Sequence, residues 1–172
     1  MDAAALRAMQ APIKERYKSA PEAALVTLKA KGALDATDIA CKVETGRALA
    51  VAGLHPAAGG SGLELCSGDM LLEALVACAG VTLSAVATAM GVTLRGGRVI
   101  AEGHWDARGT LGVDRAVPIG LTDVALTFEL DADADDATLQ RLVEMSERFC
   151  VIYQTLRTPP RLSVAHRIVA GA

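Results

Sequence analysis

The chain has 172 residues, with 17 Lys or Arg against 20 Asp or Glu, which gives a formal net charge of −3. Apolar residues make up 52% of the sequence and aromatic residues only 3%, a composition that excludes a disordered chain, a collagen-like repeat and a disulfide scaffold. The slight acidic excess argues against a nucleic-acid-binding protein, because such proteins usually carry a strong basic excess.

Two short helices are predicted at the N-terminus. Residues 4–18 and 21–31 have helical patterns, and Pro21 separates them. Gly32 follows the second pattern directly and is expected to end that helix.

The N-terminal segment also differs from the rest of the chain in charge. Residues 1–34 hold six basic and three acidic residues, whereas the remainder is net acidic. Because the length predicts one domain or one domain with an appendage, we interpret residues 1–35 as a helical extension and residues 36–172 as the main domain. The first residues lack the continuous apolar core of a secretory signal, so the expected location is the cytoplasm.

A β-hairpin is predicted after the extension. Residues 39–44 alternate loosely between apolar and polar side chains, Gly46 turns the chain, and residues 48–54 form a second apolar run. The next segment, HPAAGGSG at residues 55–62, has the composition of a loop.

The strongest predicted helix runs from Ser67 or Gly68 to Met90 and ends at Gly91, with Ser67 as its expected N-cap. Residues 74–94 carry no charge, a length that could cross a bilayer. The run is rich in Ala, Gly, Ser, Thr and Val, and it lacks the flanking aromatic residues that membrane segments favour. We therefore interpret it as a buried helix of a soluble protein, with no membrane as partner.

Strands and one further helix are predicted in the C-terminal half. Residues 92–106 and 118–130 have strand patterns, and the second shows strict apolar alternation. The acidic turn at residues 131–136 begins a helix that leads to Cys150, and residues 161–170 are predicted to close the chain as a strand. Helices set among meandering strands indicate an α+β fold.

The cysteines are the residues most informative about chemistry. They form no CxxC pair, and the histidines form no HxxxH pair, so no metal site is predicted. Cys78 falls in the middle of the uncharged helix, and Cys150 shares a helix face with inward-pointing residues, so both thiols are expected to point inward. They are either small core residues or a redox pair. Cys41 has no assigned role, and Cys66 is most simply an accidental loop cysteine.

Two segments resemble those of the OsmC/Ohr family. SGDMLLEALVACAGVTLSAVATAMG, at residues 67–91, is similar to the family's hallmark, in which an acidic, leucine-rich run leads into a helix with the first of two cysteines. SERFCVIYQTL, at residues 146–156, resembles the segment of the second cysteine. The resemblance covers roughly residues 36–170.

The resemblance implies an intertwined homodimer, in which antiparallel sheets from both subunits enclose two long central helices. It also implies a thiol-dependent peroxidase that reduces organic hydroperoxides. Cys78 would attack the peroxide and become a sulfenic acid, Cys150 would condense with it to a disulfide, and an external dithiol would reduce that disulfide. This chemistry needs no bound cofactor.

The activating residues are also implied by the resemblance. A nearby cation lowers the pKa of a reactive thiol, and peroxidases of the family use an Arg from the N-terminal strands, held by a Glu in the loop before the central helix. By position Arg47 is the best match for this Arg. Arg148 and Arg157, close to Cys150 in the sequence, are the alternatives.

The acidic partner is where the chain departs from the family pattern. Ser67 and Gly68 stand where the peroxidases have Pro-Glu, and Val151 stands where a Pro often follows the second cysteine. Asp69 matches the acidic residue of a broader OsmC-like branch, and Glu64 is a further candidate. The alternative function is therefore a non-catalytic OsmC-like protein that binds a small apolar ligand in the dimer cleft. A structural or interaction role of the basic extension ranks last.

Overall fold

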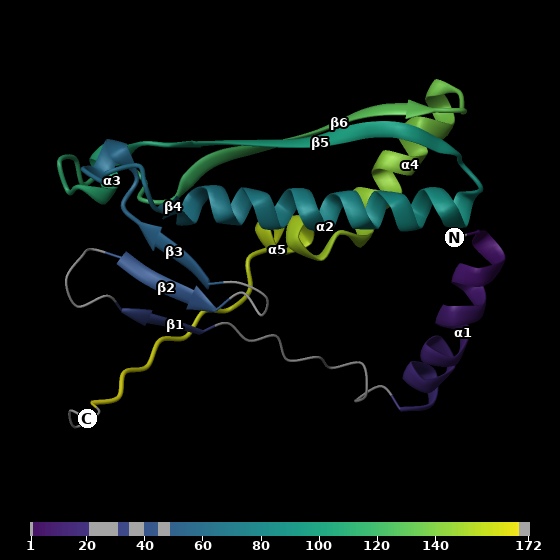
Figure 1. The fold of residues 1–172 in the computed structure, drawn as a ribbon, viewed down its shortest axis with the longest axis horizontal. Helices are drawn as coiled ribbons and strands as arrows, with labels where there is room; N and C mark the ends of the chain where they lie inside the picture. The colour runs from purple at the N-terminus through teal and green to yellow at the C-terminus, as the bar shows by residue number, and fades with distance from the viewer. Residues whose placement is uncertain (1, 21–30, 35–39, 45–48, 169–172) are drawn as a thin grey trace.

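The structure is a computed structural model that describes residues 2–20, 31–34, 40–44 and 49–168 (Figure 1). In chain order the elements are α1 (Ala3–Ser19), β1 (Lys31–Leu34), β2 (Ala40–Glu44), β3 (Leu49–Gly53), the short 3₁₀ helix η2 (Pro56–Ala58), β4 (Leu65–Cys66), α2 (Ser67–Met90), β5 (Leu94–Trp105), α3 (Ala107–Thr110), β6 (Leu121–Ala132), α4 (Asp136–Phe149) and α5 (Val151–Arg157). Helices and antiparallel strands therefore form the α+β fold that the sequence predicts.

The helix α2 runs through the centre of the fold, as predicted (Figure 1). It ends at Gly91, whose backbone φ of 73° lies in the left-handed region that glycine favours. At the other end the prediction is one residue off: Cys66 is the extended N-cap, and Ser67 is already helical. No side chain caps this end, but Asp69 in the first turn is favourable for the helix dipole.

One stripe of α2 is buried. Its members are spaced four residues apart and pack against the β5–β6 sheet and α4: Leu75, Ala79, Leu83 and Ala87. The helix is long and apolar enough to cross a membrane, yet the stripe shows that it serves as core within this chain. Val81, outside the stripe, is 74% exposed. The sequence predicts that the whole helix is buried, but in a single chain only one face of the helix is buried.

The strands β5 and β6 pair antiparallel and cover α2 from one side (Figure 1). Apolar side chains face the helix, among them Val99 and Phe128. Charged cross-strand pairs, such as Arg98 with Glu129, lie on the exposed side. Because side chains alternate between the two faces of a strand, this sheet buries one face and leaves the other in water.

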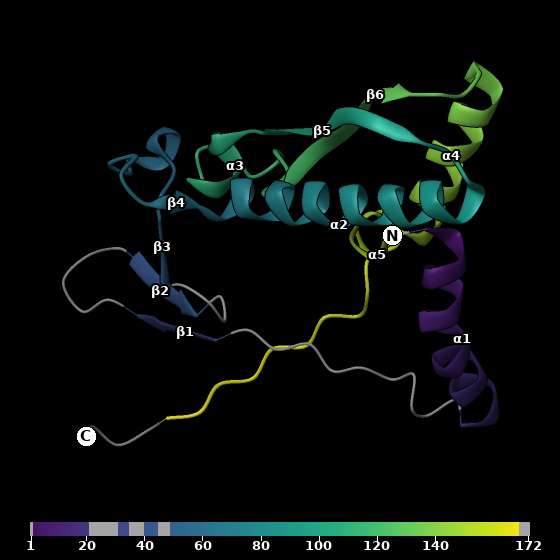
Figure 2. The same cartoon turned by 45° about the vertical axis from the view of Figure 1, so that its right-hand side comes forward.

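The N-terminal strands form a second sheet in the order β1-β2-β3-β4. The predicted hairpin is confirmed, because β2 and β3 pair antiparallel from Ala40 opposite Gly53 to Glu44 opposite Leu49. Figure 1 and Figure 2 both show β1, β2 and β3 standing away from α2.

The prediction of a second N-terminal helix is wrong at its C-terminal end. Residues 21–30 lie outside the described residues, but Lys31 begins β1, and Gly32 lies inside this strand opposite Val43. Pairing with β2 supplies backbone hydrogen bonds that local propensity does not reveal, and tertiary context overrides a weak helical pattern. β1 lies before the predicted domain boundary at residue 35 and pairs with β2, which lies after it. The boundary itself remains a prediction.

The predicted C-terminal strand is also wrong over the described residues. The chain from Arg161 to residue 168 has no regular secondary structure, and no described strand pairs with it. A strand needs a neighbouring strand for its backbone hydrogen bonds. The apolar side chains of this segment are exposed instead: Leu162 by 84%, Val164 by 98% and Ile168 by 90%.

Candidate active site

The site is built around a bend between α4 and α5. The helix α4 ends at Phe149, and Cys150 takes an extended conformation with ψ of 110°. Its backbone N–H still donates to the Ser146 carbonyl at 2.9 Å, so Cys150 closes α4. Its Sγ accepts a hydrogen bond from the Tyr153 N–H at 3.5 Å, so the same residue also caps α5. The Cys150 side chain is 1% exposed.

Cys78 and Cys150 pack against the same buried cluster; their helix faces predict only that both point inward. Cys150 is buried together with Leu75 and Ala79, and the half-buried Cys78 packs against this cluster. Both cysteines are free thiols. The two thiols lie close enough to shift each other's pKa: Cys150 lowers the pKa of Cys78, and Cys78 raises the pKa of Cys150.

The surroundings of the two thiols shift their pKa values in opposite directions. Burial by itself raises the pKa of Cys78, but hydrogen bonds from the Ile152 backbone, the Cys150 thiol, the Val151 backbone and the Thr82 side chain together bring it below the ordinary value. Burial raises the pKa of Cys150, and its neighbour Cys78 raises it further. Of the two thiols, Cys78 is therefore the one that ionises more readily to a thiolate, the nucleophilic form of cysteine.

Of the predicted activating residues, the described acidic candidates Asp69 and Glu64 are engaged away from Cys78. Arg47 lies outside the described residues. Asp69 is exposed in the first turn of α2, nine residues from Cys78, which is about 13 Å along the helix axis. Glu64 accepts a hydrogen bond from the Ser61 hydroxyl and lies against Gly53 of β3, so within the described residues it has a partner other than an arginine.

The two alternative arginines have other contacts. The Arg148 guanidinium lies over the Phe149 ring, 5.7 Å from its centroid. Arg157 Nη1 lies 2.9 Å from Glu147 Oε1. Burial raises the pKa of the Tyr153 hydroxyl, and the nearby Glu147 carboxylate raises it further, partly offset by the Arg157 charge.

Sequence reasoning missed the groups that contact Cys78. Thr82 lies four residues after Cys78 on the same helix, a spacing that places both side chains on one face, so it could have been found from the sequence. The amides of Val151 and Ile152 could not, because their direction depends on the bend at Cys150.

An apolar groove of about 490 Å³ lies beside the thiols, between α2, β6 and α5. Three of its lining residues, Leu75, Leu126 and Tyr153, also belong to the cluster around Cys150. Its charged members are Arg157 and Asp123, and hydrogen bonds from His104 and Thr122 hold the pKa of the Asp123 carboxyl below its usual range. The groove can hold an apolar molecule next to the site.

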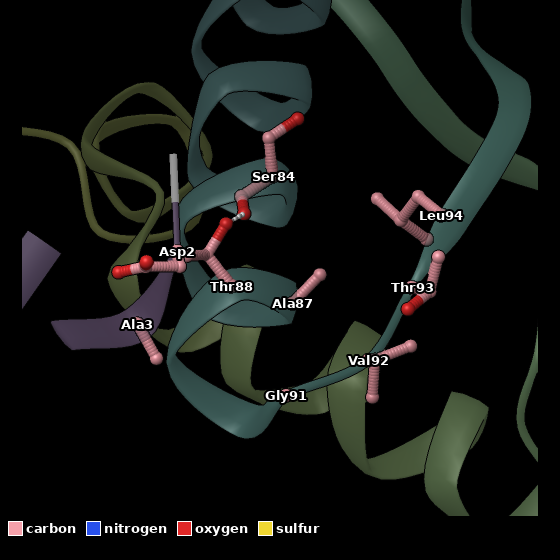
Figure 3. A pocket seen from close by; sticks show the side chains of 9 residues that line it. All are labelled: Asp2, Ala3, Ser84, Ala87, Thr88, Gly91, Val92, Thr93 and Leu94. Atoms are coloured by element: carbon pink, nitrogen blue, oxygen red, sulfur yellow. Dashed lines mark hydrogen bonds between the residues drawn. The ribbon is translucent and has the colours of Figure 1, made fainter. Parts of the chain in front are cut away.

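A second cavity, of about 460 Å³, lies between the start of α1 and the last turns of α2 (Figure 3). Its polar side chains are engaged with their own helices. Asp2 accepts from the Ala5 N–H at 2.8 Å, and the Thr88 hydroxyl donates to the Ser84 carbonyl at 2.8 Å. No cysteine is among the residues that line this cavity. In the described part of the chain, no three His, Cys, Asp or Glu side chains form a group that could hold a metal ion.

The long central helix under an antiparallel sheet, with two facing thiols at its middle, defines the class of protein. A family model described as "OsmC-like protein" matches residues 60–165, more than half of the chain. The protein therefore belongs to the OsmC-like family, as its sequence segments indicate.

Solved structures share this fold at low sequence identity. An OsmC-like protein from Mycoplasma pneumoniae has a TM-score of 0.65 and 16% identity, over 78% of this chain and 89% of its own. An organic hydroperoxide resistance protein OsmC from Legionella pneumophila has a TM-score of 0.61 and 18% identity, over 78% and 91%. An organic hydroperoxide resistance protein from Elizabethkingia anophelis has a TM-score of 0.56 and 16% identity, over 78% of this chain and 91% of its own. Curated protein sequences give no match.

Proposed function

We propose that the protein is a thiol-dependent peroxidase that reduces organic hydroperoxides through Cys78 and Cys150. The observation that carries this proposal is the contact between two free thiols whose pKa values move in opposite directions. A perturbed, partner-bound pair in a buried site is typical of functional residues. The names of the similar proteins from Legionella pneumophila and Elizabethkingia anophelis support the same substrate class.

The reaction follows from the two protonation states. The Cys78 thiolate attacks one oxygen of the hydroperoxide, the O–O bond breaks, and the alkoxide leaves as an alcohol after it takes up a proton. Cys78 is now a sulfenic acid. The Cys150 sulfur attacks the Cys78 sulfur, water leaves, and a disulfide forms. An external dithiol then reduces the disulfide by thiol–disulfide exchange. In sum, one hydroperoxide and two thiols give one alcohol, one water and one disulfide.

The groove beside the thiols is the proposed entry for the organic part of the substrate. Its walls are largely leucine side chains, so it favours an aliphatic or aromatic group over a hydrogen peroxide molecule. Tyr153 connects the groove with the cysteines, because it lines the groove and its backbone N–H contacts Cys150.

We also propose that the protein acts as a cytoplasmic homodimer. Three features support a second copy as partner: the exposed Val81 on α2, the exposed apolar side chains of the C-terminal segment, and the strands β1–β3 that stand apart from the helices (Figure 2). Apolar surface left in water costs roughly 25 cal/mol per Å². An intertwined dimer would bury these surfaces.

Turnover tests the proposal. The initial rate of loss of cumene hydroperoxide, with a dithiol as reductant, should be fast for the wild type and fall to background for Cys78→Ser. Cys66→Ser is the matched control, because Cys66 is a free cysteine at the start of the same helix without contact to the pair. Equal, background rates for the wild type and Cys78→Ser would contradict the proposal.

The second candidate function is a non-catalytic protein that binds a small apolar ligand. The departure at Ser67 and Gly68 favours it, as does the engagement of Glu64 by Ser61. Thiol titration of the native protein separates the two candidates. A fast-reacting Cys78 at neutral pH supports the peroxidase, whereas thiols that react only on unfolding support the binding protein.

A further inference from the structure

Glu147 holds three contacts across the bend between α4 and α5. It lies in the last turn of α4, and its Oε1 accepts a hydrogen bond from Arg157 Nη1 at 2.9 Å. Its backbone carbonyl accepts from Gln154 Nε2 at 3.0 Å. The Tyr153 hydroxyl lies near its carboxylate, which adds to the rise that burial causes in the pKa of Tyr153. All three partners belong to α5, so one residue of α4 is connected to most of the length of the next helix.

The position of α5 decides which groups reach the thiols. Ile152 of this helix packs with Cys78 against the same buried cluster, and the amides of Val151 and Ile152, its first two, lower the pKa of Cys78. The next amide, that of Tyr153, donates to Cys150. Hydrogen bonds to a charged acceptor are about twice as strong as neutral ones and depend steeply on distance and angle. A small rotation of α5 would therefore weaken the stabilisation of a Cys78 thiolate.

We propose that Glu147 is a positioning residue for the cysteine pair: it clamps α5 against the end of α4 and so directs the α5 amides at Cys78. Its importance for turnover rests on the proposed peroxidase function. The clamp itself concerns only the geometry at the thiols and can be tested without a peroxide.

The fold of α4 does not depend on this clamp. Leu142 and Ser146 are buried on the face of α4 that packs toward the core, whereas Glu147 is half-buried and Arg157 is exposed. An exposed ion pair contributes little to overall stability. Removal of the Glu147 side chain should thus disturb the direction of α5 far more than the stability of the protein.

Within the described residues, the titratable groups around Cys78 are few, so a change in its pKa is a direct readout of the position of α5. From α4 and α5 these are Cys150 and Tyr153, with the charged Glu147 and Arg157 behind them. From α2 the hydroxyl of Thr82 contacts it. The residues that β5 and β6 contribute to the cluster are apolar: Val99, Ala101, Leu126 and Phe128.

The sign of the effect distinguishes the clamp from simple electrostatics. Loss of the negative charge of Glu147 would by itself favour the Cys78 thiolate and lower the pKa of Cys78. Loss of the clamp moves the α5 amides away and raises this pKa. The two effects of a Glu147→Ala substitution are opposite, so the direction of the change identifies the cause.

The experiment measures alkylation of Cys78 by iodoacetamide in the reduced protein as a function of pH, with peptide mass spectrometry to follow each cysteine separately. In Glu147→Ala we expect the pH midpoint to rise and the rate at neutral pH to fall about threefold. Glu144→Ala is the matched control. Glu144 lies one turn earlier on α4, and its Oε1 accepts a hydrogen bond from Gln140 Nε2 of the same helix at 2.9 Å.

Gln154→Ala is the second variant, and it removes one contact of the clamp without changing any charge. Like Glu147→Ala, it should raise the pH midpoint of Cys78 alkylation and lower the rate at neutral pH. It can be measured even if Glu147→Ala fails to fold. An unchanged or lowered midpoint in Glu147→Ala, or an unchanged midpoint in Gln154→Ala when Glu147→Ala is unfolded, would overturn the proposal. Because no peroxide is used, a protein without peroxidase activity can still pass this test.

Discussion

At the scale of single residues, burial raises the pKa of Cys78, and polar groups among the described residues lower it below its ordinary value. The groups that contact its sulfur are backbone amides, one thiol and the Thr82 hydroxyl. These donors offset the burial of the thiol, because each favours the charged form. The family resemblance directs attention to an arginine and an acid, but within the described residues the local donors carry the effect.

Thr82→Val tests the contribution of the hydroxyl. The substitution keeps the branched shape and removes one hydrogen bond to Cys78, so we expect a higher pKa and slower alkylation of Cys78 at neutral pH. Thr88→Val is the control, because the Thr88 hydroxyl donates to the Ser84 carbonyl of its own helix. Equal rates in the two variants would show that Thr82 has no part in the activation.

The pH dependence of alkylation should differ between the two thiols. The pKa of Cys78 is lowered and that of Cys150 is raised, so alkylation of Cys78 should gain rate at a lower pH than that of Cys150. Iodoacetamide titration of the reduced protein, followed by mass spectrometry, measures both in one sample. A Cys150 that reacts at lower pH than Cys78 would reverse the assigned roles.

At the scale of elements, α4 connects the core with the site. Leu142 of α4 is fully buried against Leu83 and Ala87 of α2. This contact holds α4 in place, and the bend at its end then places the two cysteines together. The packing of α4 against α2 therefore also determines where Cys150 lies relative to Cys78.

Leu142→Ala should destabilise the fold by about 3 kcal/mol, because a buried leucine leaves a cavity on truncation. Val113→Ala, at a site 72% exposed, should stay within about 0.5 kcal/mol of the wild type. Urea denaturation followed by circular dichroism measures both. Similar midpoints for the two variants would contradict the assigned core.

The elements that sequence predicts well are those whose patterns are local. β6 has the alternating period of a strand over many residues, α2 is a long run without charges, and the glycine after α2 marks its end. Strands that depend on a partner could not be placed: Lys31–Leu34 becomes β1 only through its pairing with β2. The bend at Cys150 could not be predicted either, because no Pro or Gly interrupts the helical pattern there. The inward direction of both cysteines was predictable, whereas the donors around them depend on that bend.

At the scale of the whole molecule, a single chain leaves apolar surface uncovered. The uncovered parts are one face of α2 and the C-terminal segment, and both lie away from the buried stripe that faces β5 and β6. An exposed patch of this kind marks an interaction site. In the proposed dimer, the second copy of the chain would cover both the exposed face of α2 and the C-terminal segment.

Val164→Asp tests the dimer. The side chain is 98% exposed in the single chain, so a charge there should leave a monomer undisturbed but disrupt a dimer that buries it. Light scattering coupled to size-exclusion chromatography should give twice the chain mass for the wild type and a lower mass for the variant. A wild type at the mass of one chain would contradict the proposed assembly.

The central claim is that Cys78 is oxidised first and that Cys150 resolves it. The most direct test is the intact mass of the reduced protein after one equivalent of cumene hydroperoxide. The wild type should lose two hydrogen atoms, Cys150→Ser should gain one oxygen atom on Cys78, and Cys78→Ser should be unchanged. Oxidation of the Cys78→Ser variant at the wild-type rate, or an inert wild type, would contradict the claim.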